Sequence, residues 1–196
     1  DVDHGTYPFV TSSSASSAGI ATGLGLPASK VNNIIGILKA YTTRVGTGPF
    51  PTELFDGDGQ KLRDLGHEYG ATTGRPRRCG WFDGVAALYA ARVNGLTDVA
   101  LTKLDILDHF DEIKVCIAYE VDGKETTHMS EFLHRLDDVK PIYKTYNGWN
   151  CPTTGIGKFE YLPQAAQDYI SCLEQLIKTP VTIISTGPGR DEILMR

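Results

Sequence analysis

Short apolar runs that alternate with amphipathic segments constrain the fold of this chain more than any other feature. Residues 99–101 and 181–184 are apolar and short, as expected for strands buried on both faces. Apolar residues recur with helical spacing between residues 85 and 93, and again between residues 164 and 177. This alternation predicts an α/β domain in which helices flank a largely parallel sheet.

The remaining elements follow from local signals. Pro27 suits the first position of a helix, and the apolar residues after it recur with helical spacing. Asp122-Gly123 lies between two strand-like stretches and is a strong signal for an antiparallel hairpin. Residues 141–161, rich in Gly, Pro, Tyr and Trp, indicate irregular covering structure. The other expected elements are an extended start, a helix, a strand and a second helix: residues 4–10, 27–41, 42–45 and 60–69.

Composition limits what the chain can do. Of its 196 residues, 41% are hydrophobic, which supports a folded core. The formal net charge of -5 argues against bulk binding to nucleic acid but is compatible with a local basic pocket for phosphates. No apolar run approaches the roughly 20 residues of a membrane helix, and residues 1–4 lack the character of a signal peptide. The four cysteines form no C-x-x-C pair, so we expect reduced thiols in a cytoplasmic protein.

A Lys-Leu-Asp sequence follows the first apolar run. The Asp105 carboxylate can accept hydrogen bonds from N1–H and the 2-amino group of guanine, a donor pair that adenine lacks. The methylene stem of Lys103 can cover the base while its ammonium group stays hydrated. Ser185-Thr186-Gly187 follows the second apolar run, and ligands of α/β sheets bind at the carboxyl ends of strands. These two loops therefore predict a purine pocket, although Lys-x-Asp also occurs in ordinary solvated loops.

Residues 70–78 form a second informative segment, G-A-T-T-G-R-P-R-R. Its three arginines repel one another unless anions compensate them. Its threonines add hydroxyl donors, and arginine binds carboxylate or phosphate through two parallel hydrogen bonds. The segment predicts a loop for a small dianion or a phosphate, the alternative being a basic loop paired with surface acids. Residues 11–25, rich in Ser and Gly, indicate either a flexible surface loop or a second loop facing a ligand.

Other kinds of site have little support. The five histidines show no H-x-x-x-H spacing and are expected at the surface or in packing. The chain has no G-x-x-x-x-G-K-[ST] phosphate loop. A guanine pocket without a phosphate loop is an incomplete nucleotide site.

Together these segments resemble the adenylosuccinate synthetase family, and specifically the C-terminal half of its chain. The resemblance covers nearly all 196 residues and depends on the order and spacing of several motifs. The motifs are D-H-G-T-Y-P-F-V-T-S-S (3–13), T-R-V-G-T-G-P-F-P-T-E (43–53), E-Y-G-A-T-T-G-R-P-R-R (68–78), L-T-K-L-D (101–105), L-P-Q-A-A (162–166) and I-S-T-G-P (184–188). The resemblance implies a P-loop-NTPase-like fold, with residues 1–196 forming the C-terminal part of a single domain.

The resemblance also implies a reaction in which IMP, L-aspartate and GTP give adenylosuccinate, GDP and phosphate, with Mg²⁺ as cofactor and a homodimer as the assembly. IMP would be contacted by Thr11, Val45 and Arg75. Aspartate would be held by Ala71, Thr72, Thr73, Gly74, Arg75 and Arg77. GTP would be bound by Arg77, Lys103, Leu104, Asp105, Ser185, Thr186 and Gly187.

The chain departs from the family pattern in one large respect. The family's N-terminal phosphate loop, its catalytic aspartate and its catalytic histidine have no counterpart here, and the Mg²⁺ ligands are expected in the same N-terminal half. We therefore expect no catalytic residue in this chain and no activity from it alone. The alternatives are a non-catalytic guanine-nucleotide binding module and a structural α/β fragment that binds nothing. The loop at residues 70–78 argues against the first of these, because a simple guanine module has no use for it.

Overall fold

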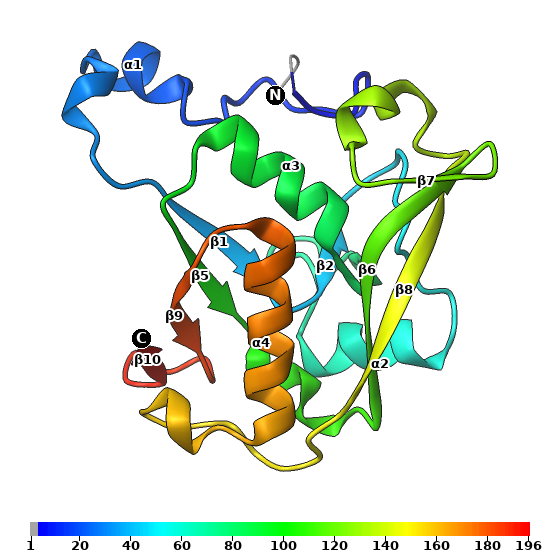
Figure 1. The fold of residues 1–196 in the computed structure, drawn as a ribbon, viewed down its shortest axis with the longest axis vertical. Helices are drawn as coiled ribbons and strands as arrows, with labels where there is room; N and C mark the ends of the chain where they lie inside the picture. The colour runs from blue at the N-terminus through cyan, green and yellow to red at the C-terminus, as the bar shows by residue number, and fades with distance from the viewer. Residues whose placement is uncertain (1–3) are drawn as a thin grey trace.

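The computed structural model describes residues 4–196, and three of the four strands of its first sheet run parallel (Figure 1). These strands are β1 (Ile35–Lys39), β5 (Asp98–Thr102) and β9 (Val181–Ser185), and β10 (Ile193–Met195) adds an antiparallel edge in the order β1-β5-β9-β10. Lys39 pairs with Thr102, and Leu101 pairs with Ile184. The carboxyl ends of the three parallel strands therefore lie at one edge of the sheet, where α/β folds bind ligands.

A second sheet is built around the long strand β6 (Glu112–Val121). β4 (Phe82–Asp83) pairs with it in parallel, and β7 (Lys124–Thr126) and β8 (Lys140–Asn147) pair with it antiparallel. The predicted hairpin joins β6 to β7, with positive φ at both turn residues, Asp122 and Gly123. A separate antiparallel pair consists of β2 (Thr42–Arg44) and β3 (Arg78–Gly80).

Helices cover these sheets, and local signals set their ends. The Asp56 carboxylate accepts hydrogen bonds from the first turn of α2 (Gly57–Leu65), and the Asp83 carboxylate does the same for α3 (Gly84–Asn94). Gly95, in the left-handed conformation, ends α3. α4 spans Gln164–Ile177, as predicted, and the short α1 spans Gly19–Leu24. Short 3₁₀ turns complete the structure: Ala28–Lys30, Leu104–His109, Met129–Glu131, Leu133–Arg135 and Phe159–Tyr161.

The main core forms around α4, which stands between the β1-β5-β9 strands and the long β6–β8 pair (Figure 1). Tyr169, Ile170 and Leu173 are fully buried and belong to the same cluster as residues of β5, β6 and β9. The Tyr169 hydroxyl donates to the carbonyl of Ala40, 2.5 Å away, and so ties the helix to the end of β1. None of the helices formed by residues 4–196 is long and apolar enough to cross a membrane.

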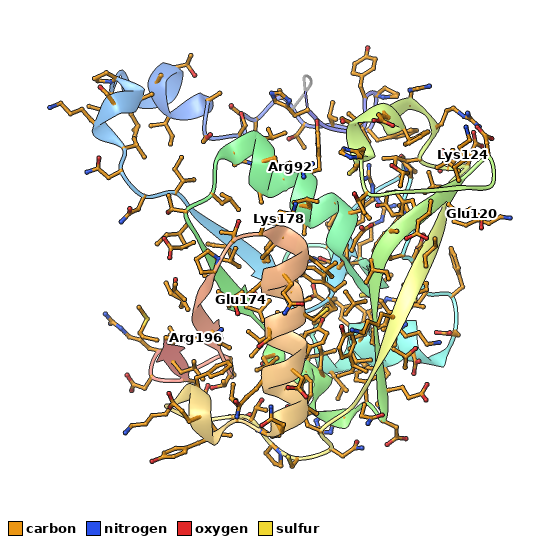
Figure 2. The ribbon with its side chains drawn as sticks, viewed as in Figure 1. Arg92, Glu120, Lys124, Glu174, Lys178 and Arg196 are labelled. Carbon is orange, nitrogen blue, oxygen red and sulfur yellow. The ribbon has the colours of Figure 1, made fainter. Side chains whose placement is uncertain are left out.

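The C-terminus is fixed to the same helix (Figure 2). Arg196 Nη1 lies 2.7 Å from Glu174 Oε2, and Glu174 Oε1 accepts a hydrogen bond from the backbone N–H of Val181. One carboxylate on α4 thus holds the start of β9 and the end of the chain. This arrangement helps to fix β9, whose far end forms part of the cavity described below.

Some predicted elements are wrong. The helix expected over residues 27–41 is a 3₁₀ turn followed by β1, because pairing with β5 determines the conformation of this segment. Residues 140–147 form β8 where irregular structure was expected, because β6 offers a complete partner strand. Residues 4–10 form turns and bends, not an extended segment, and Asp3 lies outside the described residues.

β1 occupies one edge of its sheet, and β5 is its only partner strand within residues 4–196. Ile35 and Ile37 point to the same side of β1 and are 49% and 76% exposed. Gly36, between them, packs closely against Leu96, where an added Cβ would approach a Leu96 methyl carbon to 2.3 Å. Within residues 4–196, β1 is therefore an edge strand unpaired on its outer side, and the face that carries Ile35 and Ile37 is exposed and apolar.

Candidate functional site

A cavity of about 500 Å³ opens where β5 and β9 end. The two strand-end loops identified in the sequence both line it, through Lys103 and Asp105 on one side and Ser185 and Gly187 on the other. The rest of the lining comes from Leu65, Gly66, His67, Thr102, Ile106 and Pro188. The fold thus brings together residues that are about 80 positions apart in the sequence, as expected from strands that end at one edge.

Asp105 stands in the 3₁₀ turn that follows β5. Burial raises the pKa of its carboxyl group, and the nearby negative charges of Asp108 and Glu192 act in the same direction. A hydrogen bond from its own backbone N–H opposes the rise, and no side chain of residues 4–196 donates to it. A half-buried carboxylate with spare acceptor capacity suits a ligand that brings its own N–H donors.

Lys103 adopts the left-handed conformation, with φ of 62°, directly before this turn. Its ammonium group donates to the carbonyl of Gly66, 2.5 Å away, and lies 3.4 Å from Glu68. We expected this ammonium group to stay hydrated, but in the structure it is bonded to the protein. His67, with φ of 49°, lines the same cavity. Left-handed non-glycine residues are strained and often cluster at binding sites, and here two of them face one cavity.

The loop after β9 is held by Glu192. The Glu192 carbonyl accepts a hydrogen bond from the backbone N–H of Thr186 at 2.9 Å. A Cβ added at Gly187 would approach the Glu192 carboxylate to 2.4 Å, so the Glu192 side chain packs closely against this loop. Thr186 and Leu104 are fully buried and do not line the cavity. These two expected GTP contacts are therefore not exposed to the cavity in this structure.

The loop at residues 70–77 forms a closed turn. Gly70 N–H donates to the carbonyl of Arg75 at 2.9 Å, and Gly74 N–H donates to the carbonyl of Gly70 at 2.8 Å. Ala71, Thr72, Thr73, Gly74 and Arg75 are all exposed. Gly74 has φ of 65°, a conformation that favours glycine. The backbone is thus organised by its own hydrogen bonds while its hydroxyl and guanidinium groups face outward.

The three arginines of this segment play different roles. Arg78 forms two hydrogen bonds with Glu53, of 2.8 and 2.5 Å, and Arg77 pairs with Glu68 at 2.6 Å. Within residues 4–196, no acidic side chain pairs with the exposed Arg75. The alternative expectation, a basic loop paired with surface acids, therefore holds for Arg77 and Arg78. Among these three arginines, Arg75 is the one available to bind the anionic group of a ligand.

Glu68 joins the cavity to this loop, and sequence reasoning did not single it out. Its side chain is fully buried and accepts hydrogen bonds from Lys39 Nζ at 2.7 Å and the Tyr41 hydroxyl at 2.7 Å. Its other oxygen accepts from Arg77 at 2.6 Å. Burial alone would raise the pKa of this carboxyl group, but the hydrogen bonds from Lys39, Tyr41 and Arg77 lower it to about 2.

The residues expected at IMP lie apart from the cavity. Thr11 is exposed, and Val45 is 71% exposed in the loop after β2. Arg44 connects the loop after β2 to the segment that precedes Thr11. Its Nη2 donates to Thr6 Oγ1 at 3.0 Å, and its Nε donates to the carbonyl of Thr47 at 3.1 Å. Val45 follows β2 and Arg77 precedes β3, so both lie at the same end of that two-stranded sheet.

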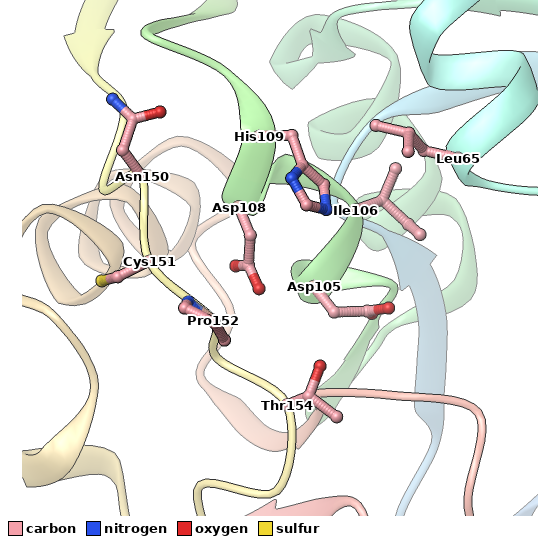
Figure 3. A pocket seen from close by; sticks show the side chains of 9 residues that line it. All are labelled: Leu65, Asp105, Ile106, Asp108, His109, Asn150, Cys151, Pro152 and Thr154. Atoms are coloured by element: carbon pink, nitrogen blue, oxygen red, sulfur yellow. The ribbon is translucent and has the colours of Figure 1, made fainter.

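A second cavity, of about 410 Å³, adjoins the first and shares Leu65, Asp105 and Ile106 with it (Figure 3). Asp108 lines this second cavity, and its carboxylate is already occupied. It accepts hydrogen bonds from Trp149 Nε1 at 2.5 Å and from the backbone N–H and hydroxyl of Thr153 at 2.7 and 2.9 Å. Asp108 therefore fixes the segment at residues 149–153, and Asp105 is the carboxylate left for a ligand.

Metal-binding clusters are absent from the described part of the chain. No group of three or more His, Cys, Asp or Glu side chains in residues 4–196 could hold a metal ion. The four cysteines are free thiols, and burial raises the pKa of Cys79 to about 11. The cavity and the exposed loop therefore offer groups that suit an organic base and a small anion.

Comparison with known proteins gives a consistent result. The family model described as adenylosuccinate synthetase matches residues 1–194. The adenylosuccinate synthetases of Geobacter sulfurreducens and Streptomyces coelicolor are both 54% identical to the chain, over 195 and 194 residues. These alignments cover 100% and 99% of this chain but 45% of each relative, so the chain spans less than half the length of these curated relatives.

Solved structures agree with the sequence comparison. The fully ligated adenylosuccinate synthetase of Plasmodium falciparum superposes with a TM-score of 0.90 at 39% identity, covering 100% of this chain and 47% of that one. The cyanophage S-2L succinoaminodeoxyadenylate synthetase, solved with dGMP and dATP, gives a TM-score of 0.57 at 20% identity, and covers 100% of this chain and 43% of that one. This second likeness shows a shared α/β fold.

Proposed function

Because the chain belongs to the adenylosuccinate synthetase family, we propose that it is the C-terminal half of a GTP-dependent ligase of purine biosynthesis. The reaction joins L-aspartate to IMP and gives adenylosuccinate, GDP and phosphate. GTP transfers its γ-phosphoryl group to the 6-oxygen of IMP, and the amine of aspartate then displaces that phosphate. Residues 1–196 would be the C-terminal part of one domain, and the phosphate loop would belong to its N-terminal part.

One observation carries the proposal. Lys103, Asp105, Ser185 and Gly187 surround a single cavity, and Glu68 connects that cavity to the exposed loop at residues 70–77. A nucleotide base and a small dianion would thus bind at adjacent places. A module that only binds guanine nucleotides needs the site for the base and has no use for the site for the dianion.

Within this site, Asp105 would select guanine by accepting from N1–H and the 2-amino group. The stem of Lys103 would lie against the base, with its ammonium group held by Gly66 and Glu68. Ser185 and Gly187 would close the opposite side of the cavity. The other GTP contacts proposed from the family are Leu104, Thr186 and Arg77.

The exposed loop would receive aspartate. Thr72 and Thr73 would donate hydroxyl groups to its carboxylates, and the Arg75 guanidinium would bind one of them with two parallel bonds. Ala71, Gly74 and Arg77 would complete this site, and Arg75 would also reach IMP. Thr11 and Val45 would contribute the remaining IMP contacts of this chain.

Cofactor, assembly and location complete the proposal. Mg²⁺ supplies positive charge to the phosphates of GTP, and the described residues offer no ligand set for it, so its ligands are assigned to the rest of the enzyme. The catalytic acid and base are assigned there as well. We propose a homodimer in the cytoplasm, with GTP, IMP and L-aspartate as the ligands and no role for nucleic acid or membrane.

The test uses the full-length protein that contains this chain. The wild-type protein should form adenylosuccinate from IMP, GTP, aspartate and Mg²⁺, followed by the change in absorbance, and a protein without this activity would refute the proposal. Asp105→Asn removes one acceptor and the charge, so kcat/KM for GTP should fall by about 30-fold to 700-fold, from a loss of about 2–4 kcal/mol. XTP, whose 2-oxo group can accept from the amide, should become a better substrate than it is for wild type.

A matched control makes the same chemical change elsewhere. Glu125→Gln alters an exposed carboxylate on β7, remote from the cavity, and should leave both nucleotides unaffected. Unchanged GTP kinetics in Asp105→Asn would remove Asp105 from the site, even if the wild-type enzyme is active.

A further inference from the structure

We propose that Glu68 is a positioning residue that links the guanine site to the aspartate loop, holding Lys103 and Arg77 with the two oxygens of one carboxylate. The inference rests on the proposed function and extends it to a residue that contacts neither ligand. Such a link would hold the guanine nucleotide and aspartate in fixed relative positions before they react. The structure provides the two halves of the link in the two oxygens of Glu68.

Each oxygen of Glu68 faces a different loop. Oε1 lies 2.7 Å from Lys39 Nζ, at the end of β1, and 3.4 Å from Lys103 Nζ, after the end of β5. Oε2 lies 2.6 Å from Arg77 Nη1, at the end of the aspartate loop. Because a carboxylate is rigid and planar, a displacement of Arg77 moves the oxygen that faces Lys103.

The backbone around Glu68 makes the same connection. The carbonyl of Gly66 accepts from Lys103 Nζ, and the carbonyl of Glu68 accepts from the backbone N–H of Arg77 at 2.8 Å. His67, between them, lines the guanine cavity in a left-handed conformation. Three consecutive residues are therefore anchored to the guanine side at one end and to the aspartate loop at the other.

The excess of positive charge around Glu68 favours the binding of anionic ligands. Three cations surround one fully buried carboxylate, and the side chains of Lys39, Arg77 and Lys103 remain 27%, 33% and 35% exposed. Glu68 thus fixes their positions without neutralising them all, and their outer sides stay available to anions. Donors that are fixed before the ligand arrives need little reorganisation when it binds.

The kinetic test uses the full-length protein and three variants. Glu68→Gln keeps the shape and removes the charge, so KM should rise about tenfold for both GTP and aspartate, while kcat stays within about threefold. Glu68→Asp keeps the charge on a shorter side chain and should restore part of both KM values. Glu120→Gln, the matched control, makes the same chemical change at a carboxylate on β6 that lines neither site, and should leave both KM values unchanged.

Hydrogen exchange gives a readout that does not depend on turnover. In Glu68→Gln, amide protection should fall together at residues 70–77 and 103–106, and in Glu120→Gln it should fall in neither segment. If Glu68→Gln does not fold, Glu68→Asp is compared with wild type for the same paired change. Loss of protection in one segment only, or a change in stability with both KM values unaltered, overturns the link. A wild-type protein without ligase activity refutes the proposed function, whereas the exchange result still decides whether Glu68 joins the two segments.

Discussion

Acidification should destabilise this protein through Glu68 more than through any exposed carboxylate. Its carboxyl group is fully buried, and three hydrogen-bond donors lower its pKa from an ordinary value of 4.5 to about 2. A group whose pKa is lower in the folded state stabilises that state above its unfolded pKa, and the contribution is lost as the pH falls toward the folded pKa. The window for this loss therefore runs from about pH 4.5 down to about pH 2.

The size of the effect follows from the same values. Lowering the pKa from 4.5 to about 2 corresponds to about 3 kcal/mol, at about 1.4 kcal/mol for each pKa unit. About 2 kcal/mol of this is lost by about pH 3. That is a large part of the roughly 5–15 kcal/mol by which folded domains exceed their unfolded chains. Asp83 and Asp105, whose pKa values are raised by burial, change stability in the opposite direction and must be separated experimentally.

A pair of variants isolates Glu68. Urea unfolding, followed by the fluorescence of the buried Trp81 and Trp149, gives the free energy of unfolding between about pH 6 and about pH 3. Lys39→Met removes the ammonium 2.7 Å from Glu68 and should reduce the loss on acidification by roughly 1 kcal/mol. Lys140→Met removes an 80% exposed ammonium, 3.8 Å from Glu120, and should change nothing. Equal pH dependence in wild type and Lys39→Met would refute this account of the buried carboxylate.

Three further predictions concern the site and its support. Arg75→Lys in the full-length protein keeps the charge and loses the planar fork, so KM for aspartate should rise strongly while KM for GTP changes little; equal changes for all substrates would indicate a folding defect. Thr153→Val removes a 2.9 Å hydrogen bond to the buried Asp108 carboxylate and should lower the free energy of unfolding by about 2 kcal/mol in urea titrations, and a loss below about 0.5 kcal/mol would contradict that role. The 196-residue chain alone should form no adenylosuccinate, since proton transfer, typically worth about 10²–10⁴-fold, has no assigned group here, and full turnover would mean that its acid or base had been misplaced.

The sequence predicts those elements whose signals are local. α4 spans the predicted residues 164–177, and α3 covers residues 85–93, where apolar residues recur with helical spacing. Strands β5 and β9 are short apolar runs that become buried, and the hairpin forms at Asp122-Gly123. In each case the residues concerned favour the conformation before tertiary contacts form.

The elements that were missed depend on partners far along the chain. β1 has apolar residues that fit a helical face as well as a strand, and only its pairing with β5 decides between them. β8 begins with Lys140-Pro141, a weak strand signal that pairing with β6 overrides. Lys103 and Asp105 could be placed from the strand they follow. Glu68 could not be placed in this way, because no neighbouring residue in the sequence indicates that the side chains of residues 39, 77 and 103 will surround it.

The outer edge of β1 makes the isolated chain prone to self-association in solution. Its backbone N–H and C=O groups on that side form no strand pairing within residues 4–196, and Ile37 beside them is 76% exposed. Such an edge is a template for any extended segment it meets, including the same edge of a second molecule. A charge at this position would suppress aggregation of the isolated chain, but burying that charge against an apolar neighbouring strand would cost free energy. The apolar edge that would let this chain join a larger sheet is thus the feature that exposes it to self-association whenever that neighbour is missing.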